Sequence, residues 1–511
     1  MYRARINTLS PSEVISGVVG LYGNSRSSRF LKDLKNGVDS LDVVVIGDSN
    51  AGDGTYGYTG GWCRALGGLH GISPYATPLF PTAGNTYAGQ GTTAIDNVLT
   101  NNTLYSWYAD STASGTTAPS GSRVPIRKLV SAALGGDTTA QAYIGPSGLN
   151  LNTTDYNTSS IADGTTMLPK SYAYSWAGTF IPSGSTFTSD TGNNYIKLVS
   201  TNPLYLGTGS GNTPLQYRVV YGRFPTSGGQ FKLLTWNNVA FSSTTSAYYS
   251  TQQTGSELWK TEKLSFTGPA YAASKEIRCT WDGFNNTNSW VTGPFAGLWH
   301  SIIRTGFKGY AVNNFIYHGG ATTTMLADRV EGCDKLLNSY LDELIQRQKE
   351  AGGSGRVLVW INSGLNNATT PDTGATWTAA MDRIISRIVS RWEAVGGLRS
   401  NLSFVVGISH PTQSAGPANA QNTVWAANRS GVASVVNAWG KNNANNGYGV
   451  AVYDINDFMP LSKLTYGVAS SATNLSLYNA TSDAHLNSTT TGLNNGYDMV
   501  LNSVISSLLS V

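Results

Sequence analysis

The stretch Leu41-Asp42-Val43-Val44-Val45-Ile46, followed at once by Gly47-Asp48-Ser49-Asn50, carries the clearest structural signal in the chain. Its first six residues are dominated by β-branched side chains without polar alternation, which is typical of a strand buried on both faces of a parallel sheet. Ser49 then follows the carboxyl end of that strand, where open α/β sheets bind their ligands and a following helix offers backbone N–H groups. A plain polar turn leaving the strand is the alternative interpretation.

The region after about residue 310 extends this strand into a sheet. Compact apolar segments alternate there with segments of helical periodicity, and short β-α units of this kind specify a parallel sheet covered by helices. The run at 41–46 supplies the missing first strand. Further strands are expected at 314–317, 357–361, 402–406 and 450–453, and helices around 27–34, 337–345, 381–392, 432–439 and 494–510.

The middle of the chain has a different character. From about 105 to 300, short alternating segments are separated by Gly, Ser, Thr and Asn clusters, which predicts an antiparallel β-sandwich. A connection this long between neighbouring β-α units is normally a folded module. We therefore expect an N-terminal segment (1–40) and one α/β domain (41–105 and 310–511) interrupted by a β-rich insertion (106–309).

Composition narrows the function classes. The net charge is +4 and no run of Lys and Arg occurs, so nucleic acid is not an expected partner. No stretch approaches the roughly 20 apolar residues of a membrane span, and the first residues lead into no apolar segment of a signal peptide. The three cysteines do not suggest a disulfide framework. Because no His, Cys and carboxylate residues cluster at ligand spacing, we expect no metal and no cofactor.

Four short motifs, in order, resemble those of the SGNH (GDSL-like) hydrolases. Gly47-Asp48-Ser49-Asn50, with Gly60-Gly61-Trp62 downstream, resembles the first motif. The second is a Gly after the next parallel strand, for which Gly320 is the better match and Gly319 the alternative. The third, Gly-x-Asn-Asp, is similar to 364–367, except that Asn367 replaces the usual Asp. The fourth, Asp-x-x-His before the last helix, is similar to 483–485 but one residue shorter.

This resemblance covers roughly 40–105 and 310–511, and it implies a fold and a mechanism. The fold is a three-layer, flavodoxin-like parallel sheet. Ser49 would attack an ester carbonyl, and His485 would accept the Ser49 proton and return it to the leaving alcohol. The oxyanion would be held by the backbone N–H groups of Ser49 and Gly320 and by the side-chain amide of Asn366.

The residue that would orient the His485 imidazole is less clearly defined by the sequence. The family motif puts Asp three residues before the His, and Ser482 occupies that position here, whereas Asp483 lies two before. Either the turn is shorter and Asp483 orients the imidazole, which we favour, or a backbone carbonyl does so and the site is a Ser–His dyad. Asp483 as a solvated loop residue is the remaining interpretation.

Other aromatic and histidine residues have weaker assignments. We expect the remaining histidines to be structural, although two of them follow predicted strands and could line the cleft. Four tryptophans in the insertion are candidate platforms for sugar rings, with burial in the core as the alternative. The histidines are His70, His300, His318 and His410, and the tryptophans are Trp236, Trp259, Trp281 and Trp290.

The expected activity is removal of O-acetyl or other short acyl groups from a carbohydrate. The charged fraction of 12% is about half that of an ordinary domain (roughly 25%), and this composition resembles phage tail spikes that deacetylate host glycans. The expected partner is an acetylated polysaccharide or cell-surface glycan, in an extracellular or virion-associated setting, with a homo-oligomer or a virion as the assembly. The alternatives are a non-catalytic glycan-binding or virion structural protein with a degenerate hydrolase domain, and a lipase or thioesterase.

Overall fold

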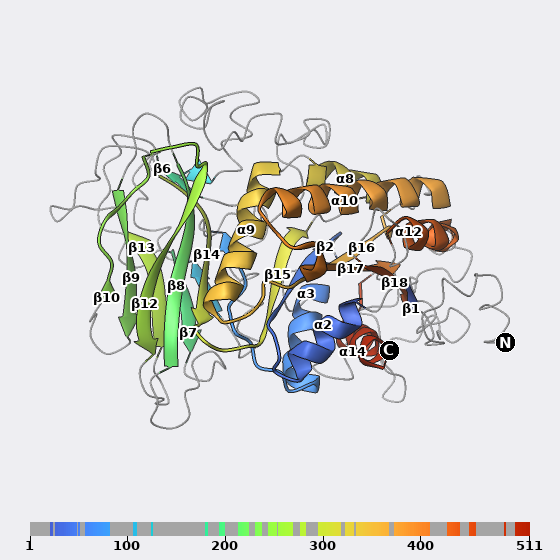
Figure 1. Cartoon of the computed structure of the whole chain (residues 1–511), viewed down its shortest axis with the longest axis horizontal. Helices are drawn as coiled ribbons and strands as arrows, with labels where there is room; N and C mark the ends of the chain where they lie inside the picture. The colour runs from blue at the N-terminus through green and yellow to red at the C-terminus, as the bar shows by residue number, and fades with distance from the viewer. Residues whose placement is uncertain are drawn as a thin grey trace. The chain divides into compact units, whose positions relative to one another are not determined.

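The chain divides into two compact units, each described here by itself (Figure 1). In the computed structural model, unit 1 comprises Met1–Ser73, Lys308–Glu331 and Leu344–Val511, and unit 2 comprises Pro74–Phe307 and Gly332–Glu343. The domain limits derived from the sequence remain a prediction. The structure describes residues 21–23, 26–48, 50–51, 57–81, 106–109, 124–125, 179–181, 194–199, 213–223, 230–237, 244–252, 254–268, 276–282, 295–317, 322–331, 334–366, 373–408, 427–439, 449–455, 485–486 and 496–510.

A six-stranded sheet forms the centre of unit 1, in the order β1-β18-β17-β16-β2-β15. All neighbouring pairs are parallel except β1 with β18, which is antiparallel. Counted along the chain, the parallel strands lie in the order 2-1-3-4-5, so the direction of winding reverses between β2 and β16. The strands are β1 (Leu21–Gly23), β2 (Leu41–Gly47), β15 (Tyr310–Tyr317), β16 (Val357–Ser363), β17 (Leu402–Ile408) and β18 (Val450–Asp454).

Helices cover this sheet in two groups, which makes unit 1 a mixed α/β structure (Figure 1). One group packs around the C-terminal helix α14, and the other packs around the long helix α10. The first group is α2 (Arg26–Lys35), α3 (Tyr58–Arg64) and α14 (Gly496–Leu509), and the second is α8 (Thr323–Glu331), α10 (Gly374–Ala394) and α12 (Val432–Trp439); α9 spans Asp334–Glu350.

The strands form where the sequence has continuous apolar runs. Every residue of β2, β16, β17 and β18 is buried, as expected for strands covered on both faces. β15 begins at Tyr310, earlier than the expected start at 314, and two buried polar residues within it form hydrogen bonds. The side-chain amide of Asn313 donates to Asp42 Oδ1 at 2.8 Å, and that of Asn314 donates to Thr59 Oγ1 at 3.1 Å.

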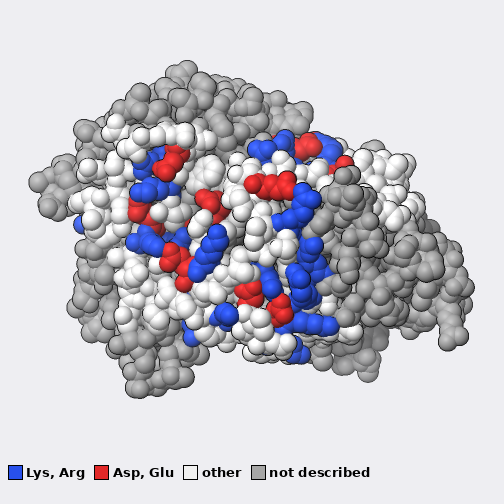
Figure 2. All heavy atoms as spheres, viewed as in Figure 1, with Lys and Arg blue, Asp and Glu red and all other residues white. Residues whose placement is uncertain are grey.

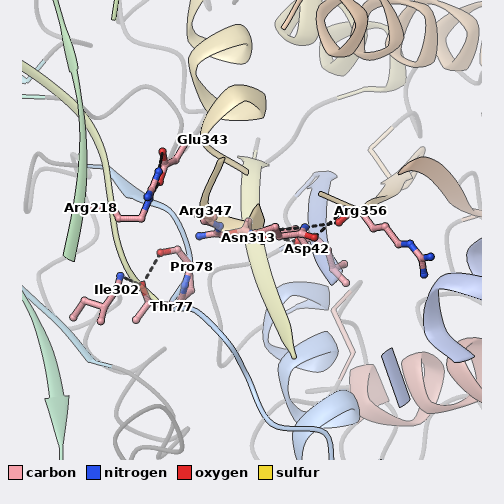
Figure 3. A network of polar contacts seen from close by, with 11 residues as sticks. Asp42, Thr77, Pro78, Arg218, Ile302, Asn313, Glu343, Arg347 and Arg356 are labelled. Atoms are coloured by element: carbon pink, nitrogen blue, oxygen red, sulfur yellow. Dashed lines mark hydrogen bonds and ion pairs between the residues drawn. The ribbon is translucent and has the colours of Figure 1, made fainter. Parts of the chain in front are cut away.

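A buried charge network lies at the start of β2 (Figure 3). Asp42 is fully buried and accepts hydrogen bonds from the Arg347 guanidinium, from Gln348 Nε2 at 2.7 Å and from Asn313. Arg347 Nη2 also donates to Asn313 Oδ1 at 2.9 Å, and Gln348 exchanges hydrogen bonds with the backbone of Arg356. The network therefore joins β2 to β15, to the end of α9 and to the start of β16.

Unit 2 contains two antiparallel sheets, one in the order β10-β9-β13-β7-β4 and the other in the order β12-β8-β14-β6-β5, with β11 and β3 pairing at their sides. The rings of Tyr221 on β8 and Phe231 on β9 contact each other across the sheets, with centroids 4.7 Å apart. On β8, Arg218 forms a buried ion pair with Glu343 at 2.6 Å. The strands are β3 (Phe80–Pro81), β4 (Ser106–Ala109), β5 (Val124–Pro125), β6 (Thr179–Ile181), β7 (Asn194–Val199), β8 (Thr213–Gly222), β9 (Gln230–Asn237), β10 (Thr244–Thr245), β11 (Tyr249–Ser250), β12 (Trp259–Gly268), β13 (Glu276–Asp282) and β14 (Phe295–Arg304).

Candidate active site

The carboxyl ends of β2 and β16 lie side by side at the point where the sheet reverses its winding. Asn362 on β16 pairs in register with Gly47 on β2. A Cβ atom at Gly47 would lie 2.6 Å from the Asn362 carbonyl oxygen, so only glycine permits this close approach. Ligands of open α/β sheets bind at such a reversal, outside the carboxyl ends of the strands.

Asp48 follows β2 and is fully buried. Its Oδ1 accepts hydrogen bonds from the backbone N–H of Asn50 at 2.9 Å and from the Asn50 side-chain amide at 3.2 Å. Burial raises the pKa of the Asp48 carboxyl; the two bonds from Asn50, the charge of His485 and the backbone N–H of Leu365 oppose that rise. Asp48 is thus a buried carboxyl that its neighbours compensate only in part.

The same interactions bring three of the sequence motifs together. His485, from the far end of the chain, is half-buried and lies within electrostatic reach of Asp48. Leu365 and the half-buried Asn366 belong to the turn that follows β16, where Gly364 adopts a φ of 110° that favours glycine. Among the described residues, the first, third and fourth motifs therefore meet at one edge of the sheet.

The remaining predicted site residues lie outside the described part of the chain. They are Ser49, Gly320 and its alternative Gly319, and Asp483 with its neighbour Ser482. Their roles stay predictions, and the choice between triad and dyad stays open. Ser49 is nevertheless joined covalently to two described residues, Asp48 and Asn50, which both lie at the edge of the sheet.

A contact that the sequence analysis missed joins this edge to α14. The Tyr497 hydroxyl donates to Asn50 Oδ1 at 2.8 Å, and both side chains are buried. The Tyr497 ring packs edge-on against Tyr58 of α3, with centroids 5.2 Å apart. Asn50 stands in the first motif and could have been considered, whereas nothing in the sequence around Tyr497 indicates its partner.

Packing between α3 and α14 keeps Tyr497 in place. Arg64 Nε forms hydrogen bonds with both carboxylate oxygens of Asp498, at 2.7 and 2.9 Å, and Asp498 is fully buried. Gly61 lies so close to α14 that a Cβ atom there would be 2.7 Å from Leu501 Cδ1. Gly61 of the Gly60-Gly61-Trp62 stretch therefore allows the two helices to approach.

The weaker sequence assignments have mixed outcomes. His300 is buried and its Nδ1 lies 3.2 Å from the Tyr217 hydroxyl, as expected for a structural residue, and His70 is half-buried. Trp259 is half-buried and donates to Asp342 Oδ2 at 3.0 Å. The backbones of Trp236 and Trp281 lie on β9 and β13, without described side chains. His318, His410 and Trp290 lie outside the described residues.

Surface charges and potential metal ligands indicate no further site among the described residues. On the face shown in Figure 2, Lys and Arg side chains lie next to Asp and Glu side chains. Arg383 pairs with Asp328 and Glu331, both at 2.5 Å. Within the described residues, no group of three His, Cys, Asp or Glu could hold a metal ion, and no helix is long and apolar enough to cross a membrane.

Comparisons with known proteins give only weak neighbours. No family model and no curated protein matches the chain. Among solved structures, a salicylyl-acyltransferase, SsfX3, from a tetracycline biosynthetic pathway is 12% identical over 64% of this chain and 92% of its own, with a TM-score of 0.24.

The CBM22-1-GH10 modules of Clostridium thermocellum xylanase 10B, complexed with xylohexaose, are 14% identical over 50% of this chain and 46% of their own, with a TM-score of 0.16. A beta-glucosidase from Kluyveromyces marxianus is 9% identical over 85% of this chain and 38% of its own, with a TM-score of 0.17. The chain thus spans less than half of either glycoside hydrolase structure. The weak neighbours include an acyltransferase and glycoside hydrolases, and scores this low assign neither a family nor a function.

Proposed function

We propose that unit 1 is an SGNH-type hydrolase domain and that the chain is a serine esterase which removes O-acetyl groups from a carbohydrate. One observation carries this proposal. Asp48 and His485, from distant parts of the chain, interact electrostatically at the carboxyl edge of β2, next to the position of Ser49 in the sequence. A serine and a histidine at such an edge are the two groups that acyl transfer requires.

The topology supports the family assignment. The order 2-1-3-4-5 of the parallel strands is that of flavodoxin-like doubly wound sheets, and helices lie on both faces. A three-layer, flavodoxin-like domain is therefore part of the proposal. The motif resemblance and the strand order are independent of each other, because the motifs concern loops and the order concerns strands.

The proposed reaction begins with attack of Ser49 Oγ on the ester carbonyl carbon. His485 accepts the Ser49 proton, and returns it to the alcohol oxygen as the C–O bond breaks and acetyl-Ser49 forms. Water, activated by His485, then attacks the acetyl-enzyme and releases acetate. Backbone N–H groups of Ser49 and Gly320 and the Asn366 amide hold the oxyanion, and loss of one such donor typically lowers the rate about 10²–10³-fold.

A carbohydrate is the proposed substrate because of composition and unit 2. The chain has a low charged fraction, and a β-rich unit separates β2 from β15. Among the four candidate tryptophans, the Trp259 indole N–H is occupied by Asp342, which favours a structural role for that residue. An acetylated cell-surface glycan, met in an extracellular or virion-associated setting, remains the proposed partner.

The first test is hydrolysis of p-nitrophenyl acetate by wild type, Ser49→Ala and His485→Ala. Each variant is expected to lose at least about 10³-fold in kcat, since neither residue of such a pair acts alone. Ser506→Ala, which changes an exposed serine on α14, is the matched control and should retain the wild-type rate. Equal rates in wild type and Ser49→Ala would refute the esterase and leave a glycan-binding protein.

Two further measurements refine the proposal. Asp483→Ala distinguishes the triad, in which kcat falls about 10⁴-fold, from the dyad, in which it is nearly unchanged. Acetate release from an acetylated polysaccharide, measured beside p-nitrophenyl esters of longer chains, separates a glycan deacetylase from a lipase. Faster turnover of the long-chain esters, with no acetate released from the glycan, would contradict the carbohydrate assignment.

A further inference from the structure

The segment on both sides of Ser49 is held from α14 through a chain of buried hydrogen bonds. Tyr497 on α14 donates to Asn50 Oδ1 at 2.8 Å, and Asn50 in turn donates to Asp48 Oδ1 through its side-chain amide at 3.2 Å. The backbone N–H of Asn50 donates to the same carboxylate oxygen at 2.9 Å. The two neighbours of the proposed nucleophile are thus linked to each other and to the last helix.

The chemistry of the partners gives this chain of bonds a direction. Asp48 Oδ1 accepts a hydrogen bond from the Asn50 side-chain amide, so the NH₂ group of Asn50 faces Asp48. Its carbonyl oxygen then faces Tyr497, whose hydroxyl is able to donate. A phenylalanine at position 497 would leave the Asn50 oxygen without this donor in a buried setting, and Asn50 would lose its link to α14.

The anchor of this chain of bonds is rigid. Tyr497 is 1% exposed, and its ring is packed against Tyr58. The next residue, Asp498, forms two hydrogen bonds with Arg64. Tyr497 therefore has little freedom to follow Asn50, and the position of Asn50 is set by the helix.

We propose that Tyr497 and Asn50 are positioning residues, which hold Asp48, the residue before the proposed nucleophile, in place relative to His485. The inference rests on the proposed esterase function. Asp48 interacts electrostatically with His485, so a shift of the Asp48 carboxyl would change the electrostatic field at the proposed base. Neither Tyr497 nor Asn50 is required to touch the substrate.

The test measures kcat and KM of the full chain for p-nitrophenyl acetate. Tyr497→Phe is expected to lower kcat about tenfold, as loss of one well-placed hydrogen bond would, with KM within about twofold of wild type since substrate contacts stay. The matched control is Tyr453→Phe, which removes a buried hydroxyl that bonds Ser503 Oγ of the same helix at 2.6 Å. Tyr453→Phe should lower the urea midpoint as much as Tyr497→Phe does and leave kcat unchanged.

A double-mutant cycle tests whether Tyr497 acts through Asn50. Asn50→Ala should lower kcat at least as much as Tyr497→Phe, and the double variant should lose no more than Asn50→Ala alone, because Tyr497 acts through Asn50. Asn50→Ala also tests the link if Tyr497→Phe does not fold. Wild-type kcat in Tyr497→Phe, additive losses, or an equal kcat loss in Tyr453→Phe would overturn the inference while Ser49→Ala remains inactive. Full activity in Ser49→Ala would instead reject the proposed function, and the inference with it.

Discussion

The two ends of β2 each carry a buried aspartate, and their surroundings differ. Asp42, near the start of the strand, accepts hydrogen bonds from a guanidinium and from two side-chain amides. Asp48, just after the end of the strand, accepts from neutral groups of Asn50 and Leu365, and the charge of His485 also favours its ionised form. A buried carboxylate that has a cation and several donors is stable in its ionised form, whereas neutral donors alone leave the desolvation of the charge incompletely offset.

This difference fits the roles proposed for the two residues, a structural one for Asp42 and one beside the proposed active site for Asp48. The network of Asp42 joins β2 to three further elements of unit 1, β15, α9 and β16. Asp48 keeps a raised pKa at the edge where ligands bind in such sheets. Burial of an aspartate is therefore informative only together with the charge of its partners.

The largest expected effect on stability comes from removing the guanidinium of Arg347, which pairs with Asp42 near the start of β2. Arg347→Met leaves Asp42 buried without its cation, and we expect a loss of about 3–5 kcal/mol in the free energy of unfolding. The same substitution at Arg383, whose side chain is 34% exposed and pairs with Asp328 and Glu331, should lower the free energy of unfolding by less than about 1 kcal/mol. Urea denaturation measures both, and equal losses would contradict the distinction.

The next largest effect is expected at the buried His300 of unit 2, whose pKa is lowered by burial. Burial holds the pKa of His300 well below 6.5, its ordinary value, so the folded state keeps the ring neutral while the unfolded state binds a proton. The contribution of His300 to the free energy of unfolding is therefore fully present above about pH 6.5 and decreases as the pH falls below it. The slope approaches about 1.4 kcal/mol per pH unit.

Urea midpoints between pH 5 and pH 8 test this sign. His300→Gln should remove most of the slope below pH 6.5. His70→Gln is the matched control at a half-buried histidine whose pKa is also lowered, chiefly by burial, and it should change the slope less. Parallel curves for wild type and His300→Gln would show that the pH dependence has another origin.

The smallest effect on stability is expected at Asp48, just after the end of β2, where we also expect an effect on kcat. The pKa of Asp48 is raised in the fold above its ordinary value of 3.8, so its contribution to stability is complete below about pH 3.8 and is lost as the pH rises from there through the raised pKa. Asp48→Asn should therefore unfold at the wild-type urea midpoint or above it, while kcat falls about tenfold because the negative charge near His485 is lost. Asp42→Asn, the same substitution at the other end, should destabilise the chain because Arg347 stays charged and buried.

Much of the sheet could be predicted because its strands are continuous apolar runs. The segments at 41–46, 357–361 and 450–453 form strands that start where the sequence predicted. β1 was missed, since the three residues of Leu21–Gly23 have no periodicity and pair only through β18. α3 was missed because two glycines oppose a helix, and it forms where Trp62 is fully buried and Gly61 meets α14.

Less of the site could be predicted, for a physical reason. The motifs indicated Asn366 and His485 because each follows a strand or precedes the last helix. The interaction of His485 with Asp48, and the bond from Tyr497 to Asn50, join residues whose proximity only the folded chain creates. Local sequence contains no signal for such pairs, so the partially compensated charge of Asp48 could not be foreseen.

The insertion of unit 2 after Ser73 has a consequence for how the chain is made. β2 has two neighbours in the sheet, β15 and β16, and both are encoded after the Pro74–Phe307 segment of unit 2. During synthesis, the apolar strand Leu41–Gly47 therefore leaves the ribosome long before either neighbour exists. Non-local pairing of this kind slows folding and exposes a hydrophobic edge meanwhile. Nascent chains that end before Val357 should accordingly be bound by chaperones or aggregate, until the last strands arrive and close the sheet.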